Sequence, residues 1–350
     1  MAIDFPSSPA VGAQYVASTG RVYLYDSASS WTSRGDTQTV NPFTNSFKYR
    51  TIYTRGYTSA GYANSSPWRN VNKTIHATDI TSNLGDILDA AASYIDGGFS
   101  DYYHYIYGMG GQVGGSSTNT LSVNMTTDAG RSNNASWNTT TSRSDCVVLM
   151  NSNLSMAYIT LGGSSATDKH NYITEVMYAS GSAPANPIGG GGTSGAGTAM
   201  FGEYRGWFNY NGSSANIDWS TETWTSAGWT TAAGTDGQPK GLSSKHGYGY
   251  SSVGSYAASA TYYKYSDVTG GSSVLSVSRP ESCGEENCQI GQNSGYTIGA
   301  YNGTQNNNST KTNYLTDTCI AMGADTQPKG HDGMSSAACG TASATVLGGA

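Results

Sequence analysis

The sequence predicts an all-β protein: a β-propeller of six blades, with seven as the alternative, preceded by a small N-terminal hairpin module. The first observation behind this prediction is the composition. The 350 residues include 46 glycines and 26 tyrosines, and charged residues make up only 11%, against a usual share of about 25%. Tyr, Thr and Val favour a pleated sheet, and glycine at this density supplies tight turns.

The second observation is a repeat. Strand-like runs begin at residues 51, 105, 158, 206, 247 and 297, with the sequences TIYTRGY, YIYGMGG, YITLGG, GWFNYNG, GYGYSSVG and TIGAYNG. After each run comes a turn rich in Gly, Ser and Asn, and then a second strand-like run such as NKTIHATDI or NYITEVM. A repeat of about 40 to 55 residues with several short strands is typical of propeller blades. A β-solenoid and a string of small sandwiches are the competing folds, but a solenoid repeat is usually shorter and a string would need linkers.

The two ends of the chain complete this prediction. Residues 335–350 read like the first strand of a further unit, so we expect them to pair near the N-terminal part of the propeller, which spans 47–350. They would then complete six blades or, with strands from before residue 47, form a seventh. The one linker-like stretch, 179–199, is expected to be a long surface loop.

The first 46 residues differ from the repeats. They predict a two-stranded hairpin, QYVA at 14–17 and RVYLYD at 21–26, turned at STG and followed by Trp31. Two strands alone are marginally stable in water. This module is therefore expected to pack on the propeller or to dock on a partner.

Charge and hydropathy narrow the classes of function. The net charge is −6 with no run of Lys or Arg, which argues against nucleic acid as a partner. No apolar stretch approaches the ~18 residues of a membrane span, and the start of the chain lacks the pattern of a secretory signal. We therefore expect a soluble protein made in a cytoplasm, without membrane insertion.

Cysteine usage gives one candidate cross-link. The five cysteines form no C-x-x-C pair, and no histidine lies beside them, so no zinc site, no other metal site and no cofactor are expected. Cys283 and Cys288, in CGEENC, are close enough in sequence to form a disulfide across a small loop.

Motifs for catalysis are absent or out of context, so the chain is expected not to be an enzyme. Gly190, Gly192 and Gly195 match G-x-G-x-x-G, but they lie in a glycine run without the following helix that a dinucleotide site requires. The carboxylates Asp79, Asp86 and Asp89 would be the candidates for a polysaccharide-degrading activity, and they are interpreted instead as turn and loop residues. His104 and His246 precede equivalent strands, which favours a structural role.

The candidate ligand-binding residues are aromatic. Most of the densest aromatic group, in the fourth unit, is expected to pack inside the blade. An exposed ligand patch, if one exists, is predicted among Trp207, Trp219, Trp224, Trp229, Tyr102, Tyr103, Tyr262, Tyr263 and Tyr265. Tyrosine and tryptophan give rigid amphipathic contacts, and the surrounding Ser, Asn and Gly give adaptable hydrogen bonds. Such surfaces suit recognition of a polysaccharide or a receptor.

Two parts of the sequence resemble a known class. DFPSSPAVGAQYV and GRVYLYDSASSW, within residues 4–31, resemble the short module that opens many tail and fibre proteins of tailed bacteriophages. The repeats resemble the kelch-like repeats of virion structural proteins from marine and cyanobacterial phages, and TDITSNLGDIL at 78–88 matches best. The resemblance spans almost the whole chain but is carried by short, degenerate phrases.

The resemblance implies a non-enzymatic virion protein, a tail fibre or tail-associated propeller. It would attach to other virion proteins of the tail, neck or capsid through residues 1–46 and present loops to a host glycan or receptor. Such parts are usually homo-oligomers, because virion sites are symmetric. The alternative is a purely structural decoration or adaptor protein of the capsid, neck or tail.

Overall fold

The computed structural model describes residues 14–16, 21–25, 31–36, 53–59, 62–63, 66–67, 69–90, 97–100, 105–109, 118–143, 146–151, 156–161, 164–172, 174–178, 184–188, 198–201, 205–210, 213–227, 241–243, 248–252, 262–266, 272–274, 287–290, 293–301, 305–322 and 337–342. In these residues the regular structure is β throughout, apart from the one-turn 3-10 helix η1 (Ala135–Trp137). The chain divides into two compact units, Met1–Arg50 and Thr51–Ala350. The sequence had placed this boundary after residue 46.

The first unit contains a three-stranded antiparallel sheet of β1 (Gln14–Val16), β2 (Arg21–Tyr25) and β3 (Trp31–Asp36). The first two strands are the predicted hairpin. The third begins at Trp31, which lies opposite Tyr25. The prediction of two strands was therefore one strand short.

The second unit contains six four-stranded antiparallel sheets, which we number in chain order. Sheet 1 is β29 (Ala337–Ala342), β4 (Tyr53–Ser59), β7 (Asn70–Ile75) and β8 (Ile80–Asp86), with the small pair β5 (Tyr62–Ala63) and β6 (Ser66–Pro67) between β4 and β7. Sheet 2 is β9 (Gly97–Ser100), β10 (Tyr105–Met109), β11 (Thr120–Asn124) and β12 (Ala129–Arg131). Sheet 3 is β13 (Cys146–Asn151), β14 (Met156–Leu161), β15 (Asp168–Asn171) and β16 (Val176–Met177).

The remaining three sheets have the same order. Sheet 4 is β17 (Thr198–Phe201), β18 (Arg205–Tyr210), β19 (Ser213–Asp218) and β20 (Trp224–Ala227). Sheet 5 is β21 (Gly241–Ser243), β22 (Tyr248–Ser252), β23 (Tyr262–Ser266) and β24 (Ser272–Val274). Sheet 6 is β25 (Asn287–Ile290), β26 (Ser294–Tyr301), β27 (Gln305–Asn313) and β28 (Thr318–Ala321). The first strand-like run predicted for each repeat overlaps the second strand of its sheet. The second run begins in or directly before the third strand, but NYITEVM shares only Asn171 with β15 and otherwise covers the turn and β16.

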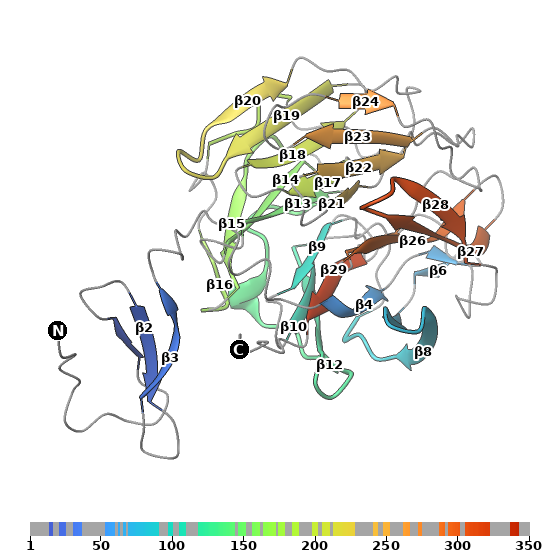
Figure 1. Cartoon of the computed structure of the whole chain (residues 1–350), viewed down its shortest axis with the longest axis horizontal. Helices are drawn as coiled ribbons and strands as arrows, with labels where there is room; N and C mark the ends of the chain where they lie inside the picture. Colours follow the sequence, from blue (N-terminus) through green and yellow to red (C-terminus); the bar gives the residue numbers. More distant parts are fainter. Residues whose placement is uncertain are drawn as a thin grey trace. The chain divides into compact units, whose positions relative to one another are not determined.

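The C-terminal strand belongs to the first sheet. Figure 1 shows β29, in red, beside β4, in blue, and the register places Ala338 opposite Tyr57 and Thr341 opposite Arg55. Residues from the two ends of the second unit therefore form one sheet, as the sequence predicted for the six-sheet case. The strands before residue 47 form their own sheet rather than part of a seventh four-stranded one in the described chain.

The first strands of the sheets contact one another in sequence order. β9 contacts β13, β13 contacts β17, β17 contacts β21, β21 contacts β25, and β25 contacts β29. β29 also contacts β9. The succession of neighbouring sheets in the second unit therefore returns to its starting point.

Both faces of sheet 3 are buried, and they belong to different hydrophobic clusters. Cys146, Val148 and Met150 pack with Tyr107 of sheet 2. Their neighbours Val147 and Leu149 point to the opposite face, since side chains alternate along a strand, and pack with Phe208, Ala215 and Ile217 of sheet 4. An uninterrupted apolar run, CVVLM, is the sequence that a strand covered on both faces requires.

Part of the stretch predicted to be a surface loop is packed. Asn186 is buried, and its Nδ2 donates hydrogen bonds to Thr160 Oγ1 at 2.7 Å and to the Ser165 carbonyl at 3.2 Å. Pro184 accepts a hydrogen bond from Trp224 Nε1 at 3.0 Å. Residues 184–188 thus lie at the surface, with 184, 185 and 187 exposed, but Asn186 anchors the segment to sheet 3.

Candidate functional site: carboxylate clasps between neighbouring sheets

Five sheets have an acidic residue in the turn between their third and fourth strands, and it adopts a left-handed backbone conformation. These residues, with φ between 54° and 57°, are Asp79, Asp128, Glu175, Glu222 and Asp317. A positive φ is unfavourable for an L-residue with a Cβ. The residues are therefore held in place by other interactions.

The turn is shaped by the residue four positions before the acid. Asn124 Oδ1 accepts hydrogen bonds from the backbone N–H groups of Thr126 and Thr127, at 2.8 and 3.1 Å, and Asn313 does the same in sheet 6. Asp218 plays this part in sheet 4. These side chains close the turn as a local mimic of backbone hydrogen bonding, and the acid then projects toward the neighbouring sheet.

Each acid is bound by a tyrosine and a cation of the preceding sheet, an arrangement that we call a carboxylate clasp. At Glu222, the Tyr158 hydroxyl donates to Oε1, while Lys169 Nζ donates to Oε1 at 3.1 Å and to Oε2 at 2.8 Å. Tyr158 lies on the second strand of sheet 3, and Lys169 lies opposite it on the third. The clasp therefore ties two strands of one sheet to the turn of the next.

The described clasps follow the order of the sheets. The pairs are Tyr57 and Lys73 with Asp128, Tyr107 and Arg131 with Glu175, Tyr158 and Lys169 with Glu222, Tyr250 and Lys264 with Asp317, and Tyr296 and Lys311 with Asp79. The last of these joins sheet 6 to sheet 1, across 232 residues between Lys311 and Asp79. The clasps, like the strand contacts, return to the first sheet.

Sheet 2 supplies its cation from a different strand. Ser122 stands opposite Tyr107, where other sheets have lysine, and Arg131 of β12 lies opposite Ser122. Arg131 Nη1 donates to Glu175 Oε1 at 2.7 Å, and its guanidinium lies 3.7 Å from the centroid of the Tyr105 ring. Sheet 2 therefore also supplies a positive charge to its clasp, but from its fourth strand instead of its third.

Sheet 4 departs from the pattern. Trp207 and Asn216 face each other across β18 and β19 at the tyrosine and cation positions, and both are buried. The next acid position also differs in the sequence: the fourth residue after Ser266 is Gly270, which itself lies outside the described residues. All three clasp positions thus change together at the junction from sheet 4 to sheet 5.

Two of the clasp acids, Glu175 and Glu222, have lowered carboxyl pKa values. Burial alone would raise the pKa of the Glu222 carboxyl, but hydrogen bonds from Lys169 and Tyr158 outweigh it and lower that pKa. Glu175 behaves in the same way with Arg131 as its main partner. Burial, together with the hydrogen bond to a carboxylate, raises the pKa of Tyr158 well above its ordinary value. A protonated phenol and an ionised carboxylate form a charge-assisted hydrogen bond. The clasps therefore act as structural contacts that hold neighbouring sheets together.

A second buried polar cluster lies within sheet 3 and the segment before it. The Arg143 guanidinium and the Asp168 carboxylate are both fully buried, with Nη2 and Oδ2 3.3 Å apart. Thr140 Oγ1 donates to Asp168 Oδ1 at 2.6 Å, and Arg143 donates to the Ala166 carbonyl at 2.9 Å. These bonds fix the connection from β12 to β13 on the sheet.

His170 also lies in strand β15 of sheet 3. It is fully buried, with its ring centroid 5.3 Å from that of Tyr107. Desolvation lowers the pKa of His170 to about 4, against an opposing effect of the Glu175 charge. The imidazole is therefore neutral at physiological pH.

Most of the predicted aromatic ligand residues that the structure describes are buried. Trp219 is 1% exposed and stacks on Tyr158, with 5.5 Å between ring centroids, and Trp207 is 4% exposed. Tyr263 and Tyr265 are also buried. The rings of these four residues pack inside and between sheets and form no exposed patch. For Trp207 and Trp219 this agrees with the expectation that most of the fourth-unit group packs inside the blade. Trp224 is half-buried and lies edge-on to Phe208 of the same sheet.

The other predicted positions fall outside the description. Trp229, Tyr102, Tyr103 and Cys283 are not among the described residues, while Tyr262 and Cys288 lie in β23 and β25 with their side chains outside it. Their binding and disulfide roles stay predictions.

Of the three candidate carboxylates, Asp79 and Asp89 have turn or loop roles, whereas Asp86 is the last residue of strand β8 and not a turn residue. Asp79 is a clasp acid, and Asp89 Oδ2 accepts a hydrogen bond from the Asn133 backbone N–H at 2.9 Å. No group of three or more metal-binding side chains occurs within the described part of the chain. The sequence analysis missed the clasps, although a signal existed: in five repeats the acid directly follows a threonine, as in Thr78-Asp79 and Thr174-Glu175.

Comparison with known proteins assigns the chain to no family. No protein-family model matches the sequence, and the search of curated proteins found no match. No helix in the described ranges is both long and apolar enough to cross a membrane. The fold and the clasps define an all-β repeat protein in which neighbouring four-stranded sheets are joined by buried or half-buried ionic contacts.

Proposed function

We propose that the six sheets of the second unit are the blades of a kelch-like β-propeller. Three observations support this proposal: the cycle of contacts between first strands, the pairing of β29 with β4, and the clasp from Tyr296 and Lys311 to Asp79. In a propeller, the last strand commonly completes the first blade and each blade packs face to face on the next. Both features match the contacts that this chain makes.

We further propose that the protein is a non-enzymatic structural component of a bacteriophage virion, a tail fibre or tail-associated propeller. The resemblance of residues 4–31 and of the repeats to such proteins supports it. The observation that carries it is the division into a small sheet unit, Met1–Arg50, and a larger unit of clasped sheets. The first would attach to other virion proteins, and the second would present its loops to a host surface as a homo-oligomer.

The proposal is tested on particles. Antibodies against the second unit should label the tail or its fibres in electron micrographs, and a variant lacking residues 1–46 should be missing from purified particles although it is expressed. Normal incorporation of this variant would overturn the attachment role. Labelling on the capsid or neck, without host binding by the purified protein, would favour the decoration or adaptor function.

The polysaccharide-degrading alternative has a separate test. The purified protein would be incubated with host surface polysaccharide, and reducing ends would be measured over time. We expect no release above that of a heat-denatured sample. Steady release would replace the non-enzymatic proposal.

A further inference from the structure

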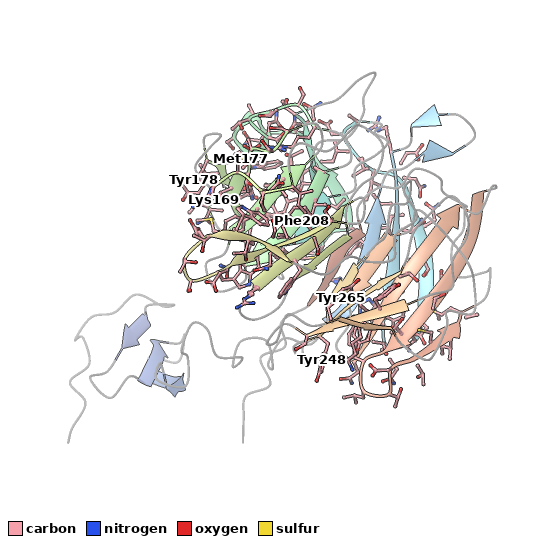
Figure 2. The ribbon with its side chains drawn as sticks, turned by 90° about the horizontal axis from the view of Figure 1, so that it is seen from above. Lys169, Met177, Tyr178, Phe208, Tyr248 and Tyr265 are labelled. Atoms are coloured by element: carbon pink, nitrogen blue, oxygen red, sulfur yellow. The ribbon has the colours of Figure 1, made fainter. Side chains whose placement is uncertain are left out.

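In sheets 1, 3 and 6, two residues at the outer edge lie beside the clasp cation of the same sheet. These are the first and third residues after the acid, which share a face because side chains alternate along a strand. In sheet 3 they are Val176 and Tyr178, which are 44% and 39% exposed. The Tyr178 backbone N–H donates to the Lys169 carbonyl at 2.7 Å, so Tyr178 lies directly opposite Lys169. Figure 2 shows both residues labelled close together on the green strands of sheet 3.

The aromatic residue is specific to sheet 3 among the described outer strands. The residues equivalent to Tyr178 are Ser82, Arg131, Thr225 and Ile320 in sheets 1, 2, 4 and 6. A small hydroxyl, a cation and an aliphatic side chain all satisfy this position. The packing of the repeat therefore does not require a tyrosine here, and its exposed ring is available for another purpose.

The clasp beside Tyr178 retains hydrogen-bonding capacity. An ammonium has three donors, and Lys169 uses two of them on Glu222. A carboxylate has about four acceptor sites, and Glu222 fills three, with Tyr158 and the two bonds from Lys169. The side chains of Lys169 and Glu222 are 14% and 30% exposed. One donor and one acceptor thus remain beside each other, held in position by the sheet-to-sheet contact.

We propose that Tyr178, Lys169 and Glu222 form a saccharide-binding site at the junction of sheets 3 and 4. The C–H face of a pyranose ring stacks on Tyr178, with Val176 extending the apolar contact. Of two neighbouring hydroxyls on the sugar, one donates to the Glu222 carboxylate and the other accepts from the Lys169 ammonium. A vicinal diol offers this donor and acceptor at the spacing of adjacent carbons, and a site that is fixed before binding loses little entropy on binding.

This inference rests on the proposed role in host-surface recognition, and it names the ligand class as a surface polysaccharide. A peptide is the less suitable ligand, because the charges of Lys169 and Glu222 already neutralise each other and a single exposed ring offers little apolar area. The site offers a ligand one aromatic ring face, one hydrogen-bond donor and one hydrogen-bond acceptor, which match a sugar ring with two neighbouring hydroxyls.

The chain offers a matched control. Tyr248 is 40% exposed and also stands beside a clasp, but Lys264 Nζ lies 4.0 Å from the centroid of its ring. One face of the Tyr248 ring is therefore covered by an ammonium that is itself bound to Asp317. Stacking on a sugar should depend on Tyr178 and be indifferent to Tyr248.

The experiment uses the full chain and saturation-transfer NMR with the methyl pyranosides of glucose, mannose and galactose as probes. We expect transfer to at least one of them, and we expect Tyr178→Ala to weaken binding about tenfold, which corresponds to about 1.4 kcal/mol. Tyr178→Phe and Tyr248→Ala should bind like the unchanged protein, and a deoxy analogue lacking the diol should give no transfer. Absence of transfer to all three probes, or equal effects of Tyr178→Ala and Tyr248→Ala, would overturn the proposal.

A second arm identifies the ligand source on cells. Periodate cleaves vicinal diols, so treating host cells with it should abolish binding of the purified protein. Binding that survived periodate but was lost after protease treatment would make a protein the ligand and would also overturn the proposal. The test is independent of particles: a chain that bound sugar through Tyr178 but was missing from virions would refute only the proposed virion function.

Discussion

Replacing Tyr158 with phenylalanine tests whether a clasp stabilises the protein. The substitution removes one hydroxyl, which donates to Glu222 of the next sheet. It leaves the aromatic ring, which is fully buried and stacked on Trp219. Because Lys169 still binds both oxygens of Glu222, the carboxylate is not left without a partner. The measured change therefore reports on the hydroxyl, which donates to Glu222 and also has a side-chain hydrogen bond with Asn151.

The expected magnitude follows from the type of bond. A hydrogen bond to a charged group contributes about 1.5–3 kcal/mol, and retention of the lysine keeps the effect in the lower part of that range. We expect Tyr158→Phe to lower the free energy of unfolding by about 2 kcal/mol. Glu222→Gln removes the charge that both donors bind, so its loss should be larger.

The assay is equilibrium unfolding in urea, followed by tryptophan fluorescence, for the unchanged protein and both variants. Tyr178→Phe serves as the control, because it removes an exposed tyrosine hydroxyl and should change stability by no more than about 0.5 kcal/mol. The reasoning would be refuted if Tyr158→Phe and Tyr178→Phe had the same small effect, since the clasp hydroxyl would then contribute nothing.

Three further predictions concern the clasps and their surroundings. The free energy of unfolding should fall by about 3 kcal/mol between pH 6.5 and 4, because the unfolded chain binds a proton on His170 while the folded chain, with a pKa of about 4, does not; a flat urea midpoint across this range would contradict it. At the other extreme, the raised pKa values of four clasp tyrosines mean that their contribution to stability is complete below pH 10 and is lost above it. The pH at which fluorescence-detected unfolding begins would check this. At the junction of sheets 4 and 5, we expect a lower melting temperature for the single variant Gly270→Asp and for the double variant Trp207→Tyr with Asn216→Lys. The triple variant should have a melting temperature several degrees above the value expected from adding the two losses. Strictly additive losses would show that the three side chains do not contact one another.

Much of the fold was predictable because it depends on local patterns. Most second and third strands carry aromatic and β-branched residues between glycine- and asparagine-rich turns, so periodicity located them, whereas β15, with the sequence DKHN, was missed. Apart from β29, the first and fourth strands were not predicted, since short segments such as GGFS in β9 and AGR in β12 have little strand propensity of their own. Those strands form because a neighbour of the same sheet offers hydrogen-bonding partners, which a local pattern does not contain.

The clasps could be predicted only in part. The Thr-acid phrase marks the turns, but nothing near Glu222 in sequence points to Tyr158, which lies 64 residues earlier. The aromatic candidates show a related limit of local pattern: the sequence expects most of the fourth-unit group to be packed, but only the packing of sheets 3 and 4 identifies Trp207 and Trp219 as buried members. Tyr178 was not singled out, because its exposure depends on its place in an outer strand.

The sharing of sheet 1 between the two ends of the second unit also has a consequence during synthesis. Strand β4 emerges from the ribosome almost 280 residues before its partner β29, which begins at Ala337. Asp79 must likewise wait for Tyr296 and Lys311. A nascent chain halted before residue 296 therefore has an unpaired edge on β4 and an Asp79 carboxylate whose donors have not yet been made. The β4 edge is open to pairing with another such chain until β29 is translated.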